Sequence, residues 1–145
     1  MDAVRVKKLR DNAILPTYGS ADAAGADLYA CLESELSIQP GASAFIPTGL
    51  AMEIPKGYVG LIYARSGLAC KRGLAPANKV GVIDSDYRGE FIVVLHNHGD
   101  SVQTVANGER IAQLVITPVI TPGFVETEDL TNTDRAAGGF GSTGK

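Results

Sequence analysis

The chain has 145 residues, of which 45% are hydrophobic and 20% charged, and its formal net charge is −3. This length corresponds to one domain with a modest core, and a net negative charge argues against broad binding to nucleic acid. No run approaches the roughly 18 apolar residues of a membrane span. The charged start, Met1–Lys8, lacks the apolar core of a signal peptide. We therefore expect an intracellular, cytoplasmic protein that binds neither nucleic acid nor membranes.

Short apolar runs separated by turn-forming residues indicate a chain built from β-strands. The 17 glycines and 7 prolines leave little room for long helices. One short helix is expected over Ser66–Lys71, with Ser66 as its N-cap. The fold class is therefore all-β, a sandwich or barrel of short strands. The expected strands are Val4–Leu9, Leu36–Ile38, Tyr58–Ala64, Val80–Ile83, Phe91–Leu95 and Ile111–Ile116.

The end of the chain differs in composition, because four of the seven residues from Gly138 to Gly144 are glycine. Such a segment forms no strand or helix of its own and is expected to be mobile. A disordered terminus would explain the glycines, whereas Arg135 and Phe140 favour an arm that orders over a ligand. Arg135 and the Gly-Ser-Thr backbone would bind an anion, and Phe140 would stack on a flat ring.

A candidate anion site lies at Ala64–Gly67, where an expected strand ends and the short helix begins. Unpaired backbone N–H groups and the positive end of the helix dipole meet there. Arg65 can contact phosphate oxygens through two N–H groups, and the Ser66 hydroxyl can donate a hydrogen bond. The alternative is a capped helix that carries a surface arginine.

Two carboxylates stand beside or within apolar strands. Asp84 follows an apolar run in an expected long hairpin over residues 81–89, and at the inner end of a buried strand it would lose solvent and become a base. The alternative is an Asp-rich turn. Asp27, inside the apolar segment 24–30, needs a partner such as an arginine, a backbone donor or a hydrated Mg²⁺ ion. Gln113 shares a strand face with Ile111 and is expected to be an inward polar group that also needs a partner.

The cysteines and histidines do not favour a reactive site. Cys31 and Cys70 are interpreted as ordinary thiols, because Cys70 has basic neighbours but no histidine in its motif. His96 and His98 form a His-x-His pair near a turn, and the sequence holds no third histidine to complete a metal site.

Taken in order, these segments resemble the five motifs of trimeric dUTPases, the deoxyuridine triphosphate nucleotidohydrolases. The resemblance implies a jelly-roll-like β-barrel over residues 1–130 and a flexible arm over residues 131–145. It implies a homotrimer whose sites are shared between subunits, with the arm closing over a site. The implied reaction is hydrolysis of dUTP to dUMP and pyrophosphate with Mg²⁺, which removes dUTP from the DNA precursor pool and supplies dUMP for thymidylate synthesis. The motifs are AGADLYA (24–30), ARSGLA (64–69), GVIDSDYRGEF (81–91), ERIAQLVI (109–116) and RAAGGFGSTG (135–144).

The resemblance also implies a role for each matching residue. Asp84 would be the general base for the water that attacks the α-phosphorus, Tyr87 would pack on the deoxyribose, and Asp27 would hold Mg²⁺ through water. Uracil would be recognised around Asn78, Gly81, Val82, Ile83 and Ile92, with Phe140 stacked on it. The phosphates would be bound by Arg65, Ser66, Gly67 and Gln113, and from the arm by Arg135, Gly141, Ser142 and Thr143.

One position departs from the family pattern: Ala136 stands where the last motif more often has glycine. Alanine disfavours a positive φ by about 1–2 kcal/mol, so arm closure would be weakened if φ is positive there.

Three alternatives share the fold or the pattern: a dUTP-responsive binding or regulatory protein, a dCTP deaminase, and a trimeric structural β-protein. The presence of Asp84 and Asp27 favours catalysis over binding alone. The Tyr87 motif and the C-terminal arm favour a dUTPase over the other two.

Overall fold

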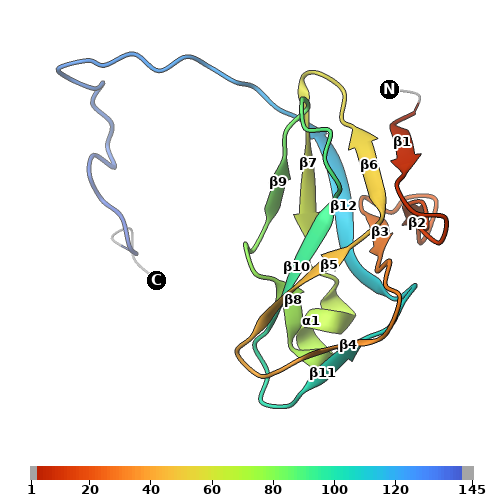
Figure 1. Ribbon diagram of the computed structural model, residues 1–145. Helices are drawn as coiled ribbons and strands as arrows, with labels where there is room; N and C mark the ends of the chain where they lie inside the picture. The colour runs from red at the N-terminus through yellow and green to blue at the C-terminus, as the bar shows by residue number, and fades with distance from the viewer. Residues whose placement is uncertain (1–2, 142–145) are drawn as a thin grey trace.

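Strands account for nearly all of the regular structure in the computed structural model, which describes residues 3–141 (Figure 1). This confirms the prediction of a mostly β fold with one short helix. The helix, α1 (Ser66–Arg72), lies between β7 and β8. The strands are β1 (Arg5–Lys8), β2 (Thr17–Tyr18), β3 (Ala26–Tyr29), β4 (Leu36–Ile38), β5 (Ser43–Pro47), β6 (Leu50–Glu53), β7 (Tyr58–Tyr63), β8 (Leu74–Pro76), β9 (Gly81–Ile83), β10 (Ile92–Asn97), β11 (Gln103–Val105) and β12 (Arg110–Pro118).

The strands form sheets that enclose one core. A five-stranded sheet has the order β2-β3-β12-β7-β9, and a three-stranded sheet has the order β5-β10-β8. The pairs β1-β6 and β11-β4 complete the walls, and every pairing is antiparallel. Each of these sheets contributes side chains to a single buried cluster, for example Leu28, Ile38, Ile46 and Met52. Because all the walls share this core, they hold the loops between them in defined positions.

Helix α1 begins directly after the extended backbone of Arg65 (φ −92°, ψ 129°) and ends at Gly73 in the left-handed region (φ 67°). The expectation that Ser66 is the N-cap is wrong, because Arg65 occupies that position and makes no side-chain capping bond. Leu68, on the inner face of the helix, is buried in the core. The side chain of Arg72 pairs with Glu109 and donates from Nε to Gln103 at 3.0 Å, which ties the helix to the turn before β12.

Two further sequence expectations are wrong, and both errors concern pairing between distant strands. The segment from β9 to β10 is not a paired hairpin, since β9 pairs with β7 and β10 pairs with β5 and β8. Gln113 does not share the core face of Ile111, because the register with β3 shifts between Arg110 and Ala112. Ile111 is the extra residue, and beyond it Ala112 and Leu114 face the core while Gln113 lies on the opposite face.

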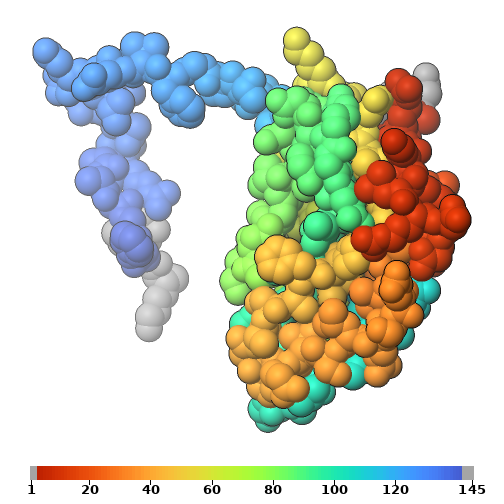
Figure 2. Space-filling model, in the orientation of Figure 1, coloured from red at the N-terminus to blue at the C-terminus, as the bar shows by residue number. Residues whose placement is uncertain are grey.

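The chain leaves the barrel after β12. Residues 119–141 form no helix or strand, and Figures 1 and 2 show this segment projecting away from the rest of the molecule. Its large apolar side chains are exposed, with Phe124 at 98% and Ile120 at 88%. In the part of the chain that the structure describes, no helix has the length and hydrophobicity to cross a membrane.

Candidate functional site

Near the end of β7 lies a group of four side chains from β3, β12 and the residue before α1, which we call the arginine cluster: Asp27, Arg65, Arg110 and Gln113. Asp27 Oδ1 accepts a hydrogen bond from Arg65 Nε at 2.8 Å, and Asp27 Oδ2 lies 3.4 Å from an Arg110 nitrogen. The Asp27 side chain is only 13% exposed, whereas those of Arg65 and Arg110 are 26% and 52% exposed. Two cations held by one carboxylate leave a positive charge at an accessible position, which suits an anionic ligand.

Gln113 supports the same strand end through the backbone. Its Nε2 donates to the carbonyl oxygen of Ala64 at 2.8 Å, so the sequence expectation of a partner for this side chain is confirmed. Ser66 and Gly67 follow at the exposed start of α1. The first bond within the helix runs from the N–H of Ala69 to the carbonyl of Arg65, so the preceding amides make no bond within the helix. Four of the residues predicted to bind phosphate therefore lie together: Arg65, Ser66, Gly67 and Gln113.

A second group of predicted site residues follows β9. Asp84 is exposed in the single chain, so the expectation that it lies at the inner end of a buried strand is wrong. Tyr87 is 42% exposed, donates its hydroxyl to the carbonyl of Glu90 at 2.9 Å and packs against Phe91 with ring centroids 6.1 Å apart. A side chain at Gly89 would collide with the Tyr87 ring, since a Cβ there would lie 2.4 Å from its hydroxyl. Tyr87 is thus held in place while its side chain stays partly exposed.

Between β9 and β10 lies a small cleft of about 70 Å³. β9 is the edge strand of its sheet, so the backbone groups on its outer side face this cleft without a neighbouring strand. A wider depression of about 280 Å³ adjoins it and includes Asp84, Tyr87 and the exposed ring of Phe45. The lining of the small cleft contains all five residues predicted to recognise uracil: Asn78, Gly81, Val82, Ile83 and Ile92.

One chain does not bring these two groups together. β9 pairs with β7 so that Ile83 lies opposite Gly60, which places Asp84 beside Val59. Arg65 is six residues further along the same extended chain, a separation of about 20 Å at the usual rise per strand residue. In Figure 1, α1 lies at one end of β7 and the turn after β9 lies at the other.

The predicted arm residues contact neither group. Arg135 donates from Nε to the carbonyl of Gly138 at 3.0 Å, and Phe140 is fully exposed. Ala136 has a φ of +46° and Phe140 a φ of +51°, both in the left-handed region. Gly141 is exposed, while Ser142 and Thr143 lie outside the described residues.

Two residues of the site were not singled out from the sequence. Arg110 belongs to the quoted segment 109–116, and the need of Asp27 for a cationic partner was the signal that could have identified it. Phe45, 71% exposed in β5, lies opposite Val94 of β10 and lines the depression beside Asp84. A lone aromatic residue in a short strand carries no sequence signal for this position.

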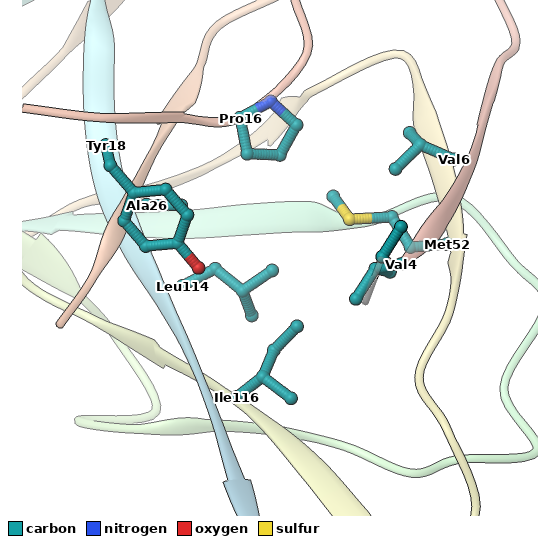
Figure 3. Close-up of a pocket in the computed structure, with 9 residues that line it drawn as sticks. Val4, Val6, Pro16, Tyr18, Ala26, Met52, Leu114 and Ile116 are labelled. Carbon is teal, nitrogen blue, oxygen red and sulfur yellow. The ribbon is translucent and has the colours of Figure 1, made fainter. Parts of the chain in front are cut away.

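Other candidate positions do not resemble a catalytic centre. An apolar groove of about 380 Å³ lies between β1, β3, β6 and β12, and its lining includes Met52, Leu114 and Ile116. Among residues 3–141 it is lined by no charged side chain (Figure 3). Within residues 3–141, no three His, Cys, Asp or Glu side chains gather to hold a metal ion. His96 Nδ1 lies 2.9 Å from the hydroxyl of Ser43, and Cys31 is buried.

Known proteins similar to this chain include dUTPases from several bacteria. The dUTPase family model matches residues 11–144. The chain is 49% identical over 141 residues to a deoxyuridine 5'-triphosphate nucleotidohydrolase of Syntrophotalea carbinolica, a match that covers 97% of this chain and 96% of that protein. It is 54% identical over 131 residues to a protein of the same name from Desulfitobacterium hafniense, with 90% and 87% covered.

Solved structures of phage dUTPases share the fold. The dUTPase of Staphylococcus bacteriophage 80alpha with dUPNHPP matches with a TM-score of 0.92 at 29% identity, and the match covers 100% of both chains. A mutant dUTPase from phage phi11 of S. aureus, described with a structural Mg(II) ion, matches with a TM-score of 0.80 at 27% identity over 88% of this chain and 98% of that one.

The position of Asp27 between two arginines predicts a measurable contribution to stability. Asp27→Asn removes the negative charge that both cations face, and we expect the free energy of unfolding to fall by about 1–3 kcal/mol. Glu53→Gln is the matched control, because Glu53 also lies between two arginines, Arg5 at 3.2 Å and Arg88 at 3.9 Å, but is 42% exposed. Its loss should stay below about 1 kcal/mol. Urea unfolding measures the free energy of unfolding of both variants, and equal losses in Asp27→Asn and Glu53→Gln would contradict the prediction.

Proposed function

This chain belongs to the dUTPase family and is a deoxyuridine 5'-triphosphate nucleotidohydrolase, and we propose that Asp84 and the arginine cluster carry out its reaction. The enzyme converts dUTP and water to dUMP and pyrophosphate. The assignment of this activity rests on the 49% identity to a relative of that name, which covers 97% of the chain. We assign to it the removal of dUTP from the DNA precursor pool and the supply of dUMP for thymidylate synthesis, and with this role a cytoplasmic location.

In the proposed mechanism, Asp84 orients a water molecule and takes its proton. The water oxygen bonds to the α-phosphorus as the bond from that phosphorus to the α,β-bridging oxygen breaks, and pyrophosphate leaves with that oxygen. The exposure of Asp84 in the wide depression supports this role, because water has access to its carboxylate. Positioning and neutralisation of charge supply most of the acceleration in phosphoryl transfer.

The cleft between β9 and β10 is proposed to recognise uracil. A strand edge offers alternating N–H and C=O groups, which can match the donor and acceptor edge of the base. The small volume of this cleft favours a pyrimidine without further substituents. Tyr87 is proposed to cover the deoxyribose and leave no space for a 2′-hydroxyl. The bond from its hydroxyl to Glu90 and its contact with Phe91 support this role, since they hold the ring in one orientation.

The arginine cluster is proposed to bind the phosphates, with Arg65 making contacts through its guanidinium group. Ser66 and Gly67 would add their exposed amides, and the Ser66 hydroxyl would add a further donor. The ion pair with Asp27 supports this assignment, because it aligns Arg65 before the ligand arrives. A pre-aligned guanidinium loses less side-chain entropy when it binds a phosphate than a free one would.

Magnesium is the proposed cofactor, and the residues present fit an ion held mostly by the substrate. Each oxygen of Asp27 faces an arginine, which does not suit direct coordination of a metal. A carboxylate oxygen accepts more than one hydrogen bond, so Asp27 can also accept one from a metal-bound water. When bound, the ion supplies positive charge that neutralises the triphosphate.

We propose a homotrimer in which each site combines groups from different subunits. The separation of about 20 Å between Asp84 and Arg65 along β7 supports this arrangement, because both must reach one nucleotide. The arm, residues 131–145, is proposed to close over a site on a neighbouring subunit and to bring Arg135, Phe140, Gly141, Ser142 and Thr143 to the substrate. The projection of residues 119–141 away from their own barrel supports this assembly.

The role of Asp84 predicts a selective loss of turnover. Asp84→Asn keeps the shape of the side chain but removes the base, so kcat should fall by about 100-fold or more with little change in KM. Asp86→Asn, in the same turn, is the matched control and should stay within about threefold of the wild type. Pyrophosphate release from dUTP, dCTP, dTTP and UTP measures both variants and the selectivity of the wild type. A kcat near the wild-type value in Asp84→Asn would remove the base assignment, and release of ammonia from dCTP would favour a deaminase.

We propose that the closed arm keeps the positive φ of Ala136, a conformation that a free arm in solution can leave, so glycine at this position is expected to improve closure. Ala136→Gly removes a strain of about 1–2 kcal/mol, and about 1 kcal/mol corresponds to roughly fivefold in KM. If the whole strain is released on closure, we therefore expect KM for dUTP to fall by about fivefold to thirtyfold, as measured by steady-state kinetics. Ala137→Gly adds the same chain flexibility where no positive φ is found, and it should leave KM unchanged or raise it. An equal effect of the two variants would show that φ at residue 136 is irrelevant.

A further inference from the structure

Gly25 lies directly before β3, where its backbone is covered by the side chain of Gln113. A Cβ atom at residue 25 would lie 2.4 Å from Gln113 Oε1 and 3.1 Å from both Cδ and Cβ of that side chain. The first distance is shorter than any contact that real Cβ atoms make. The space occupied by the Gln113 amide therefore exists only because residue 25 has no side chain.

The Gln113 amide in turn determines the orientation of one peptide at the end of β7. Its Nε2 donates to the carbonyl oxygen of Ala64, and that carbonyl belongs to the same planar peptide as the N–H of Arg65. In a trans peptide the two groups point in opposite directions, so holding the carbonyl also fixes the Arg65 N–H. Gly25 and Asp27 are two residues apart at the start of one strand, and Asp27 holds the Arg65 side chain at 2.8 Å.

We propose that Gly25 is a positioning residue of the phosphate-binding group, acting through Gln113 on the peptide between Ala64 and Arg65. The segment 25–27 thus supports Arg65 twice: Asp27 holds its guanidinium group, and the backbone of Gly25 leaves room for Gln113 to hold its peptide. Gly25 is proposed to act only through its contact with Gln113, which is itself one of the residues predicted to bind phosphate. This inference rests on the proposed role of the arginine cluster in binding phosphate.

Gly25→Ala is expected to displace the Gln113 amide rather than to prevent folding, because Oε1 is the free end of a flexible side chain. We expect kcat/KM for dUTP to fall about tenfold or more. Binding of deoxyuridine, which has no phosphate, should stay unchanged, whereas general damage to the fold would weaken it. Gly19→Ala is the matched control: no atom lies within 4 Å of a Cβ at that position, and activity should match the wild type.

A double variant tests whether Gly25 acts through Gln113. Gln113→Ala should lower kcat/KM by a similar factor, and Gly25→Ala/Gln113→Ala should be no worse than Gln113→Ala alone, because the colliding amide is gone. If the two losses multiply instead, Gly25 acts by another route and the proposal is overturned. If Gly25→Ala does not fold, the double variant is expected to fold, and its failure would also overturn the proposal. A kcat/KM of the Gly25→Ala variant equal to that of the wild type would also overturn the proposal.

Binding of inorganic triphosphate, measured by calorimetry, separates this proposal from the proposed function. Triphosphate binding reports on the arginine cluster and needs no turnover. Gly25→Ala should weaken this binding by the same factor by which it lowers kcat/KM. Wild-type protein that binds triphosphate but releases no pyrophosphate from dUTP would refute the catalytic assignment and leave the positioning role of Gly25 intact. Unchanged triphosphate binding in Gly25→Ala would refute the positioning role alone.

Discussion

The antiparallel pairing of β7 with β9 on one edge and β12 on the other decides where the candidate site residues lie. Pairing with β12 brings Gln113 next to the strand end that carries Arg65, while pairing with β9 places Asp84 at the opposite end. A rigid strand then keeps the proposed base and the proposed phosphate ligands about 20 Å apart. The fold of one chain is complete without uniting them, which is why the proposed mechanism requires more than one copy.

The charge of Asp27 explains why the two arginines of the cluster can stay close together before a ligand binds. Arg65 and Arg110 would repel each other without Asp27, whose largely buried carboxylate lies against both. The pair with Arg65 is protected from solvent more than a surface ion pair, so salt screens it less. The remaining positive charge faces outward beside the exposed start of α1. A triphosphate arriving there would meet aligned donors, so little of its binding energy is needed to order them.

Local patterns predicted the mostly β fold class and several of its strands, but they did not single out β2, β5, β6, β8 or β11, and they could not give the pairing between distant strands. The runs around β4, β7 and β9 were expected to within one residue, because alternation and turn residues act over short distances. The sheet to which β9 belongs and the register shift at Ile111 depend on distant partners. The same holds for the candidate site. The segments around Arg65 and Asp84 could be identified from the sequence. The pairing of Arg110 with Asp27 and the position of Phe45 could be seen only in the folded structure, because they join distant strands.

Mixing two inactive variants tests most directly whether the site is shared between subunits. Arg65→Ala and Asp84→Asn each remove one of the two groups, and neither variant should hydrolyse dUTP well by itself. If a site takes Asp84 from one subunit and Arg65 from another, equal co-assembly gives two intact groups in about a quarter of the sites. We expect pyrophosphate release near a quarter of the wild-type rate after the variants are unfolded and refolded together. Activity no higher than the average of the separate variants, in oligomers shown to be mixed, would show that the two groups do not come from different subunits.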